Sequence, residues 1–309
     1  MTASLDLRTI VAEARAIGAR GEPTDHLTRA SCALVLDSLD VDPSTSFDAL
    51  VSPVLSSRNP LDDSLLAGAS GRSWMISGHA SHVPNALGAR LLLTVVRSRP
   101  FAGRERGLRV YSIDADTPGV TITALETIDA DRAGRITYDA VQIGDERVVG
   151  PSRDATVALG AAFDCIVLVA VAEMLGAADA ARRSAMRSVQ SRVQFGEPLA
   201  RRQAVAHRVA DMTIACDAVS LMLADALASA IDNTHRPEPL AVASTKLAAS
   251  VQLPLVTASA HQLHGGEGYY ADQPMHRWHR RVSSLAMQFG DRRTMRARAA
   301  ELLGLAPVF

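Results

Sequence analysis

Lysine, cysteine and aromatic residues are all scarce in this chain of 309 residues. Lys246 is the only lysine, so any Schiff-base chemistry would depend on that one residue. The three cysteines, Cys32, Cys165 and Cys216, are odd in number, widely spaced and without a CxxC pair. They indicate neither a disulfide framework nor a thiolate zinc site, and they fit a reducing cytoplasm.

The sequence also lacks an excess of either charge, since 32 Lys and Arg residues face 33 Asp and Glu residues. A net charge of −1 gives no general attraction to nucleic acid or to anionic lipid. The N-terminus has acidic residues and no apolar segment of the signal-peptide kind. The longest uninterrupted apolar stretch, residues 165–172, is too short to cross a bilayer. We therefore expect a cytoplasmic protein with no nucleic-acid and no membrane partner.

Hydrophobic residues make up 48% of the chain, as in globular proteins with a substantial core. Apolar residues spaced by three and four predict helices over residues 5–20 and 25–40, with Thr24 and Asp25 available to cap the second helix. Frequent Pro, Ser and Gly residues predict loop or edge strand over residues 47–72.

Residues 73–150 contain six short runs rich in Val, Ile, Leu and Thr, separated by Gly, Pro and Asp. This pattern predicts a small antiparallel barrel or sandwich. The strands are expected at residues 73–78, 90–98, 107–114, 119–128, 134–143 and 146–150.

Helical periodicity returns after residue 155 and predicts a four-helix bundle. The expected helices cover residues 155–193, 202–231, 240–264 and 275–303. The fold class is therefore α+β and mainly α. Its predicted domains are a truncated N-terminal helical domain at residues 1–48, a middle β domain at 49–152 and the bundle at 153–309.

Two motifs in the bundle identify a family. The first is Arg192-Val193-Gln194-Phe195-Gly196-Glu197-Pro198-Leu199, followed by Gln203, His207, Ala210, Asp211 and Met212. The second is Gln262-Leu263-His264-Gly265-Gly266-Glu267-Gly268-Tyr269. In this order and spacing they resemble the acyl-CoA dehydrogenase family, and the resemblance extends from Asp48 to Leu303.

These residue types suit a flavin dinucleotide. An arginine offers planar donors to a pyrophosphate, a phenylalanine packs against adenine, and adjacent glycines let backbone N–H groups approach phosphate oxygens. Each also has a simpler interpretation, as a solvated arginine, a core aromatic residue and an ordinary helix end. What the resemblance implies is that the chain binds the ADP part of a FAD shared with a partner subunit. The implied FAD-binding residues are Arg192, Gln194, Phe195, Gln203, Gln262, Leu263, His264, Gly265 and Gly266.

The resemblance also shows what is missing. Family members need a carboxylate base, and the two positions that carry it align here with Phe289 and Ile166. Neither side chain accepts a proton, so no catalytic residue is predicted; Glu173 is the reserve candidate. Residues 49–58 resemble a degraded form of the flavin-contacting strand of the family, with Val54 and Ser56 in place of glycines and Arg58 in place of an acid.

We therefore expect a base-less subunit of a heteromeric α2β2 acyl-CoA dehydrogenase, whose catalytic partner supplies the base, the flavin-ring pocket and most of the acyl-CoA site. The expected reaction is α,β-dehydrogenation of a CoA thioester, with steroid side chains as one candidate substrate. Two alternatives remain open. One is a self-sufficient or repurposed homo-oligomeric flavoenzyme, and the other is a structural subunit without flavin.

Other residue groups suggest weaker functions. His261, His264, His276 and His279 have a spacing that could bring imidazoles together, but a metal site needs further ligands and none is predicted. The basic run at residues 276–281 resembles nucleic-acid surfaces, but a solvated or interface helix face is the better explanation, since the net charge is close to zero. The carboxylates of Asp164, Glu173 and Asp211 lie in apolar helical stretches, where a buried carboxylate could act as a base. For Glu173, the reserve candidate, a capped or ion-paired helix residue is the better explanation. A serine hydrolase is not indicated, since no GxSxG motif occurs.

Overall fold

The computed structural model describes residues 5–22, 24–43, 46–51, 65–70, 73–98, 107–129, 131–150, 154–232 and 236–305. The chain divides into two compact units. The sheet unit contains residues 1–6 and 24–166, and the helical unit contains residues 7–23 and 167–309. The predicted α+β class with mainly helical content is confirmed.

The sheet unit contains one eight-stranded mixed sheet and the helix α2 (His26–Ser38). The strand order is β6-β7-β3-β2-β4-β5-β8, and β1 pairs with β4. The strands are β1 (Ala49–Val51), β2 (Leu65–Ser70), β3 (Ser73–Val83), β4 (Leu91–Ser98), β5 (Gly107–Asp114), β6 (Val120–Ala124), β7 (Gly134–Gly144) and β8 (Val148–Val149), with a 3-10 turn η1 (Asp145–Arg147) before the last.

All six predicted strands are present, but the sheet is mixed and not, as predicted for the barrel or sandwich, antiparallel throughout. Strands β1 and β2 run parallel to β4, and the described strands do not close on themselves. The alternation of residue types fixed which segments form strands, whereas the two parallel pairings come from the region predicted as loop or edge strand. Pairing direction depends on contacts between distant segments, which the alternation does not encode.

Large side chains fill the core of the sheet unit, and their polar atoms are paired. Trp74 and Tyr138 are buried. The indole N–H of Trp74 donates to Oδ1 of Asp145 at 2.8 Å, and the Tyr138 hydroxyl lies 3.0 Å from that of Thr94. Burial raises the pKa of Tyr138 above its ordinary value near 10, which keeps this phenol neutral.

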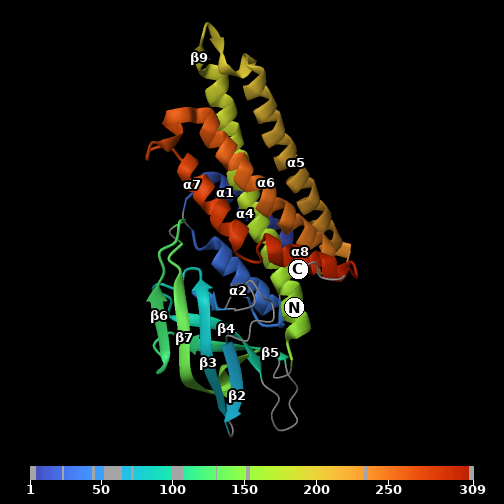
Figure 1. The fold of residues 1–309 in the computed structure, drawn as a ribbon. Coiled ribbons are helices and arrows are strands. Elements are labelled where there is room, and N and C mark those ends of the chain that lie inside the picture. The colour runs from blue at the N-terminus through green and yellow to red at the C-terminus, as the bar shows by residue number, and fades with distance from the viewer. Residues whose placement is uncertain are drawn as a thin grey trace. The chain divides into compact units, whose positions relative to one another are not determined.

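The helical unit contains α1 (Leu7–Arg20), the long helix α4 from Val167 onward, and four later helices (Figure 1). Helix α4 covers Thr156–Ser191, and the later helices are α5 (Gln203–Asp232), α6 (Pro239–His264), α7 (Met275–Met287) and α8 (Arg292–Leu302). A hairpin of β9 (Val193–Gln194) and β10 (Glu197–Pro198) leads through η2 (Leu199–Arg201) into α5, and η3 (Gly265–Tyr269) follows α6.

The predicted N-terminal helices are present, and Thr24 takes part in capping the second one. Its hydroxyl accepts a hydrogen bond from the His26 backbone N–H at 3.1 Å. Asp25 occupies the N-cap position, but its side chain makes no capping hydrogen bond.

The fourth helical stretch is not one helix, as predicted, but two. Phe289 and Gly290 have φ values of +55° and +93°, which no helix accommodates. The Asp291 side chain then accepts a hydrogen bond from the Thr294 backbone N–H and begins α8. Before the break, Lys246 of α6 donates to the backbone carbonyl of Leu285 in the last turn of α7.

Lys246 is fully buried. Desolvation lowers the pKa of its ammonium from 10.5 to about 7, against an opposing influence of Asp291. The only lysine of the chain therefore ties α6 to the end of α7 and is a structural residue in this fold.

Two glycines allow α1 to approach α4 very closely. An added Cβ at Gly18 would overlap the backbone carbonyl oxygen of Glu173, and one at Gly176 would overlap that of Arg15. The two contacts are reciprocal, because each glycine faces a backbone carbonyl of the other helix. Trp278 of α7 supports the end of α1 by donating its indole N–H to the Ala19 carbonyl at 3.1 Å.

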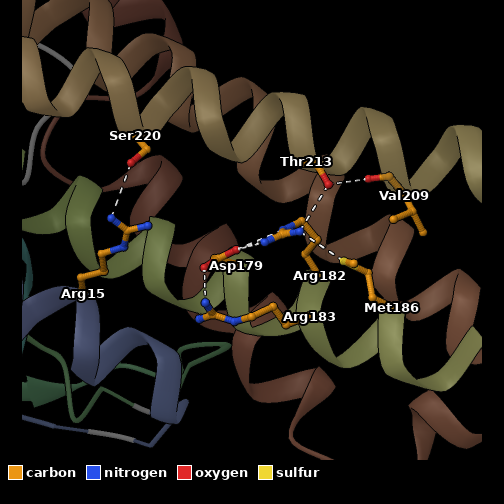
Figure 2. Close-up of polar contacts among 8 residues, drawn as sticks. All are labelled: Arg15, Asp179, Arg182, Arg183, Met186, Val209, Thr213 and Ser220. Carbon is orange, nitrogen blue, oxygen red and sulfur yellow. Dashed lines mark hydrogen bonds and ion pairs between the residues drawn. The ribbon is translucent and has the colours of Figure 1, made fainter. Parts of the chain in front are cut away.

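A polar layer connects α4 to α5 inside the helical unit (Figure 2). Asp179 is buried and pairs with Arg182 at 2.6 Å and with Arg183 at 2.8 Å. Arg182 also donates to the Thr213 hydroxyl of α5 at 3.3 Å. The inward side of α5 therefore carries polar contacts.

In the part of the chain that the structure describes, three helical stretches are long and apolar enough to cross a membrane, judged by length and composition alone: α4, residues 203–230 of α5, and residues 239–269. Their most apolar windows are 78%, 28% and 44% buried within the protein. The protein itself thus covers most of the apolar surface of α4, whereas much of that on α5 faces outward. The absence of a membrane partner stays a prediction.

Candidate functional site

The two sequence motifs meet at one end of the helical unit. Arg192 follows the last residue of α4 and lies at the base of the β9–β10 hairpin, which Figure 1 shows at the tip of the unit. Its Nη1 donates to the backbone carbonyl of His264, the last residue of α6, at 3.4 Å. Residues 192 and 264, which are 72 positions apart, are therefore neighbours as the resemblance implied.

The hairpin presents an aromatic ring to solvent. Phe195 and Gly196 form its turn, and both have positive φ, at +57° and +84°. Phe195 is 87% exposed, and the guanidinium of Arg202 lies over its ring at 5.3 Å. Phe195 is thus not a core residue, and a non-glycine residue with positive φ at an exposed position is uncommon and typical of functional sites.

Hydrogen bonds on both ring nitrogens fix the side chain of His264. This residue is buried, and its Nδ1 lies 2.9 Å from the Ala260 carbonyl, which only accepts. Nδ1 therefore carries a proton and donates it to that carbonyl, and Nε2 lies 3.3 Å from the Ser184 hydroxyl. The ring connects α6 to α4 directly before the glycine pair.

The backbone at the glycine pair is open. Gly265 has φ of +63°, and an added Cβ would find only Nη1 of Arg192, at 3.8 Å. An added Cβ at Gly266 would find nothing within 4 Å. An anionic group therefore has room to approach this turn, beside a guanidinium that never loses its charge.

The remaining predicted binding residues are exposed or half-buried. Gln194 and Gln262 are exposed, Leu263 is half-buried, and Gln203 is exposed in the first turn of α5. The structure thus brings together Arg192, His264 and the glycine pair. The side chains of Gln194, Gln203 and Gln262 are exposed at the surface. Gln194 and Gln262 lie two residues from Arg192 and His264, respectively, in the sequence.

Two residues of this site were missed in the sequence. Ser184 orients His264, and Arg202 covers Phe195. Arg202 could have been found, since it lies seven residues after Phe195 within the first motif. Ser184 carries no sequence signal, because its place beside His264 results from the packing of α4 against α6.

The other histidines form a small aromatic cluster next to this site. The His261 ring lies 5.4 Å from Tyr269 and 5.5 Å from His279. Burial lowers the pKa of both imidazoles, and His279 lowers that of His261 further. Within the described ranges, no three His, Cys, Asp or Glu side chains are arranged to hold a metal ion.

The candidate base positions contain no available base. Phe289 is buried in the turn between α7 and α8, and Ile166 is fully buried in α4. Glu173 is also buried, and its Oε1 accepts from Nε of Arg281 at 2.7 Å, as in the ion-paired alternative for this residue. The expected replacements at residues 54, 56 and 58 lie outside the described residues.

The three cysteines are buried, and none of them forms a disulfide. Burial raises the pKa of Cys32 and of Cys165 to about 12, and that of Cys216 to about 11. Thiolate chemistry at neutral pH is therefore disfavoured at all three.

Residues 158–304 match the model of the acyl-CoA dehydrogenase C-terminal domain. The mitochondrial short-chain specific acyl-CoA dehydrogenase of Bos taurus is 28% identical over 218 residues, which cover 69% of this chain and 52% of that enzyme. The (R)-benzylsuccinyl-CoA dehydrogenase of Thauera aromatica is 34% identical over 54% of this chain and 41% of that enzyme. The chain thus matches only about half of the length of these relatives.

Among solved structures, the Tcur3481-Tcur3483 steroid ACAD variant is 25% identical, with a TM-score of 0.82 over 96% of this chain and 81% of that chain. The ChsE4-ChsE5 complex from Mycobacterium tuberculosis has the same TM-score over 98% of this chain and 82% of that chain, at 19% identity. At 19% identity, the likeness to the ChsE4-ChsE5 complex shows a shared fold alone.

Proposed function

Since the chain belongs to the acyl-CoA dehydrogenase family, we propose that it is the subunit of a two-chain acyl-CoA dehydrogenase that binds the ADP part of FAD for a catalytic partner. The proposed reaction is α,β-dehydrogenation of a CoA thioester. FAD, when bound, supplies the hydride acceptor. The residues of this chain bind and orient the dinucleotide.

The exposed ring of Phe195 carries this proposal. The free energy of exposing a phenylalanine at a hairpin tip is unfavourable, and so is its positive φ. Both become useful when a planar group such as adenine covers the ring. Arg202 lies over the same ring and adds a positive charge beside it.

The second element of the proposal is the anion-binding turn. Arg192 is charged at every physiological pH, and the open backbone at Gly265 and Gly266 has room for a diphosphate. His264 orients this end of α6 through its bonds to Ala260 and Ser184. These residues fit the diphosphate and adenine of FAD, and none of them fits the reactive flavin ring.

The residues at the base positions support a non-catalytic role. Phe289 and Ile166 accept no proton, and Glu173 is held by Arg281. A carboxylate paired with a half-buried guanidinium is a poor base, because its protonation would weaken that ion pair. We therefore propose that the partner provides the base.

We further propose a heteromeric complex acting on a steroid side-chain thioester. The likeness to a steroid ACAD at 25% identity supports the substrate class, and the likeness to the ChsE4-ChsE5 complex supports a second chain. Steroid side-chain CoA esters are therefore the first substrates to assay.

The proposal is tested by the visible spectrum of the purified protein. The chain is expected to be colourless alone and to become yellow after co-expression with a family member that carries the base. A yellow chain with stoichiometric FAD and turnover by itself would instead show a self-sufficient flavoenzyme. A colourless but stable complex would show a structural subunit.

The variant Arg192→Ala tests the residue assignment within that complex. We expect FAD content to fall at least about tenfold, which corresponds to about 1.4 kcal/mol, while the mass of the complex stays unchanged. Arg277→Ala removes an exposed arginine outside the site and is the matched control. Equal FAD content in both variants would refute the assignment.

A further inference from the structure

The β9–β10 hairpin at the tip of the helical unit carries a carboxylate among arginines (Figure 1). Residues 192–208 contain four arginines and a single acidic residue, Glu197. Glu197 pairs with Gln194 across the two-residue turn of the hairpin. Its Oε1 lies 3.2 Å from Nε of Arg202, and its Oε2 lies 3.9 Å from Nε of Arg201. One carboxylate is therefore shared between two guanidinium groups.

The same carboxylate lies next to the proposed adenine platform. The guanidinium of Arg202 covers the exposed ring of Phe195 at 5.3 Å while it pairs with Glu197. Since Arg202 contacts both neighbours at once, Glu197 helps to hold it over the ring. Phe195, Arg202 and Glu197 thus form one continuous group of contacting side chains.

Backbone hydrogen bonds connect this group to the arginine of the diphosphate turn. The Leu199 N–H donates to the Arg192 carbonyl, and the Arg202 N–H donates to the Leu199 carbonyl, both at 3.0 Å. A ligand with its diphosphate at Arg192 and its adenine on Phe195 has to span this hairpin with its ribose. Glu197 and Arg202 belong to the same hairpin and its connection to α5, so they are the charged side chains that the ribose meets.

Two kinds of ADP group are present in the proposed complex. The ribose of the ADP group in FAD carries no phosphate, whereas the CoA of a thioester substrate carries a phosphate on its ribose 3′ oxygen. That monoester has a charge of about −2 at pH 7. Arginines alone would favour the ligand with the extra phosphate, because guanidinium groups pair with phosphate oxygens. A site reserved for FAD therefore needs a negative group near the ribose.

We propose that Glu197 is the residue that makes this site select FAD over CoA. Its carboxylate neutralises Arg201 and Arg202 and repels a 3′-phosphate, whereas a ribose with free hydroxyl groups is accepted. This inference rests on the proposed function, because it assigns ligand selection to the ADP site proposed there. Glu197 is a specificity-determining residue in this role and takes no part in the chemical step.

The exposure of the three charged side chains limits the size of the effect. Glu197, Arg202 and Arg201 are 39%, 44% and 74% exposed. Water and salt screen charges at such positions, so the 3′-phosphate is expected to weaken binding by about fivefold to tenfold. For the same reason, the selectivity should decrease as the NaCl concentration rises.

The test compares CoA with dephospho-CoA, two ligands that differ only in the 3′-phosphate. Each competes with FAD for the flavin-depleted two-chain complex, and flavin fluorescence measures how much FAD is bound. Wild type is expected to bind dephospho-CoA about fivefold to tenfold more tightly than CoA. In Glu197→Gln this ratio should fall to about one or below, because Arg201 and Arg202 then attract the phosphate.

Two further variants control for the change of side chain. Glu197→Asp keeps the charge and should keep most of the selectivity. Glu301→Gln removes an exposed glutamate of α8 outside the site and should leave the ratio unchanged. A purely structural role of Glu197 would lower the affinity for all three ligands together and leave the ratio as it is. Equal binding of CoA and dephospho-CoA by wild type, or the same ratio in wild type and Glu197→Gln, would overturn the proposal.

The two proposals fail in different ways. If Arg192→Ala lowers the FAD content of the complex while Glu197→Gln leaves the ratio of CoA to dephospho-CoA binding unchanged, only the selectivity assigned to Glu197 fails. If Arg192→Ala leaves the FAD content unchanged and neither CoA ligand displaces FAD from wild type or Glu197→Gln, the hairpin is not the FAD site and both proposals fail.

Discussion

Replacing Gly18 by alanine is expected to destabilise the helical unit by about 1–3 kcal/mol, although alanine is the better helix former. The reason is the close approach of α1 and α4. An added Cβ would overlap the Glu173 carbonyl oxygen and lie 3.1 Å from the Ala177 backbone nitrogen. Both neighbours are backbone atoms of a long helix, so no side chain can turn away to make room.

Two opposing effects determine how much Gly18→Ala changes the free energy of unfolding. Alanine gains about 0.5–1 kcal/mol over glycine inside a helix, through the lower entropy of the unfolded chain. Against this, α1 must move away from α4 by about 1 Å, which loses contacts along both helices in a closely packed interior. Overpacking of this kind has an unfavourable free energy of about 1–3 kcal/mol and outweighs the gain.

Thermal unfolding measures the effect, and α4 contains a matched control. Gly160 is also a helical glycine, but an added Cβ there meets nothing within 4 Å. Gly160→Ala should therefore raise the melting temperature, and Gly18→Ala should lower it by about 2–4 °C for each kcal/mol. Gly176→Ala, the reciprocal change, should resemble Gly18→Ala. A Gly18→Ala variant as stable as Gly160→Ala would refute the close packing of the two helices.

Three further predictions concern buried polar groups. Asp179→Ala should destabilise the protein by about 3 kcal/mol, since it leaves the half-buried Arg182 without its carboxylate, and urea denaturation checks this. The Lys246 ammonium has a pKa of about 7 when folded and 10.5 when unfolded, so the unfolded chain binds more protons between these values and stability should rise with pH there. Lys246→Met should remove that rise, on the order of 1 kcal/mol per pH unit, and an unchanged slope would contradict the burial of the charge. Because burial lowers the pKa of His261 below 6.5, stability should fall as pH drops below 6.5, and less so in His261→Phe when melting temperatures are compared at pH 5 and pH 7.

The local patterns in the sequence predicted most elements correctly because those patterns are themselves local. Alternating β-branched residues marked the strands after residue 73, and the apolar period marked α1, α2, α4, α5 and α6. The break within the last helical stretch was missed. The apolar period continues across Gln288 to Asp291, and only the left-handed conformations of Phe289 and Gly290 interrupt the helix.

The residues of the candidate site could be predicted from the sequence, but the contacts that hold them in place could not. The motifs supplied Arg192, Phe195, His264 and the glycine pair. The exposure of Phe195 and the bond from Ser184 to His264 came from tertiary packing. The pairing of Glu173 with Arg281, 108 residues later, could not be predicted from the sequence either, since no local pattern shows which charged residues meet in a core.

The sequence by itself determined the helices, the strands, the family motifs and the lack of a base at the two expected positions, because residue type and spacing act over one or two turns of chain. Only the tertiary structure decided that β1 and β2 run parallel to β4, that Gly18 and Gly176 let α1 approach α4, and that Ile214 and Leu221 of α5 face outward. These features depend on which distant segments share a surface. That choice is made by packing and burial over the whole unit, and no short window of sequence contains it.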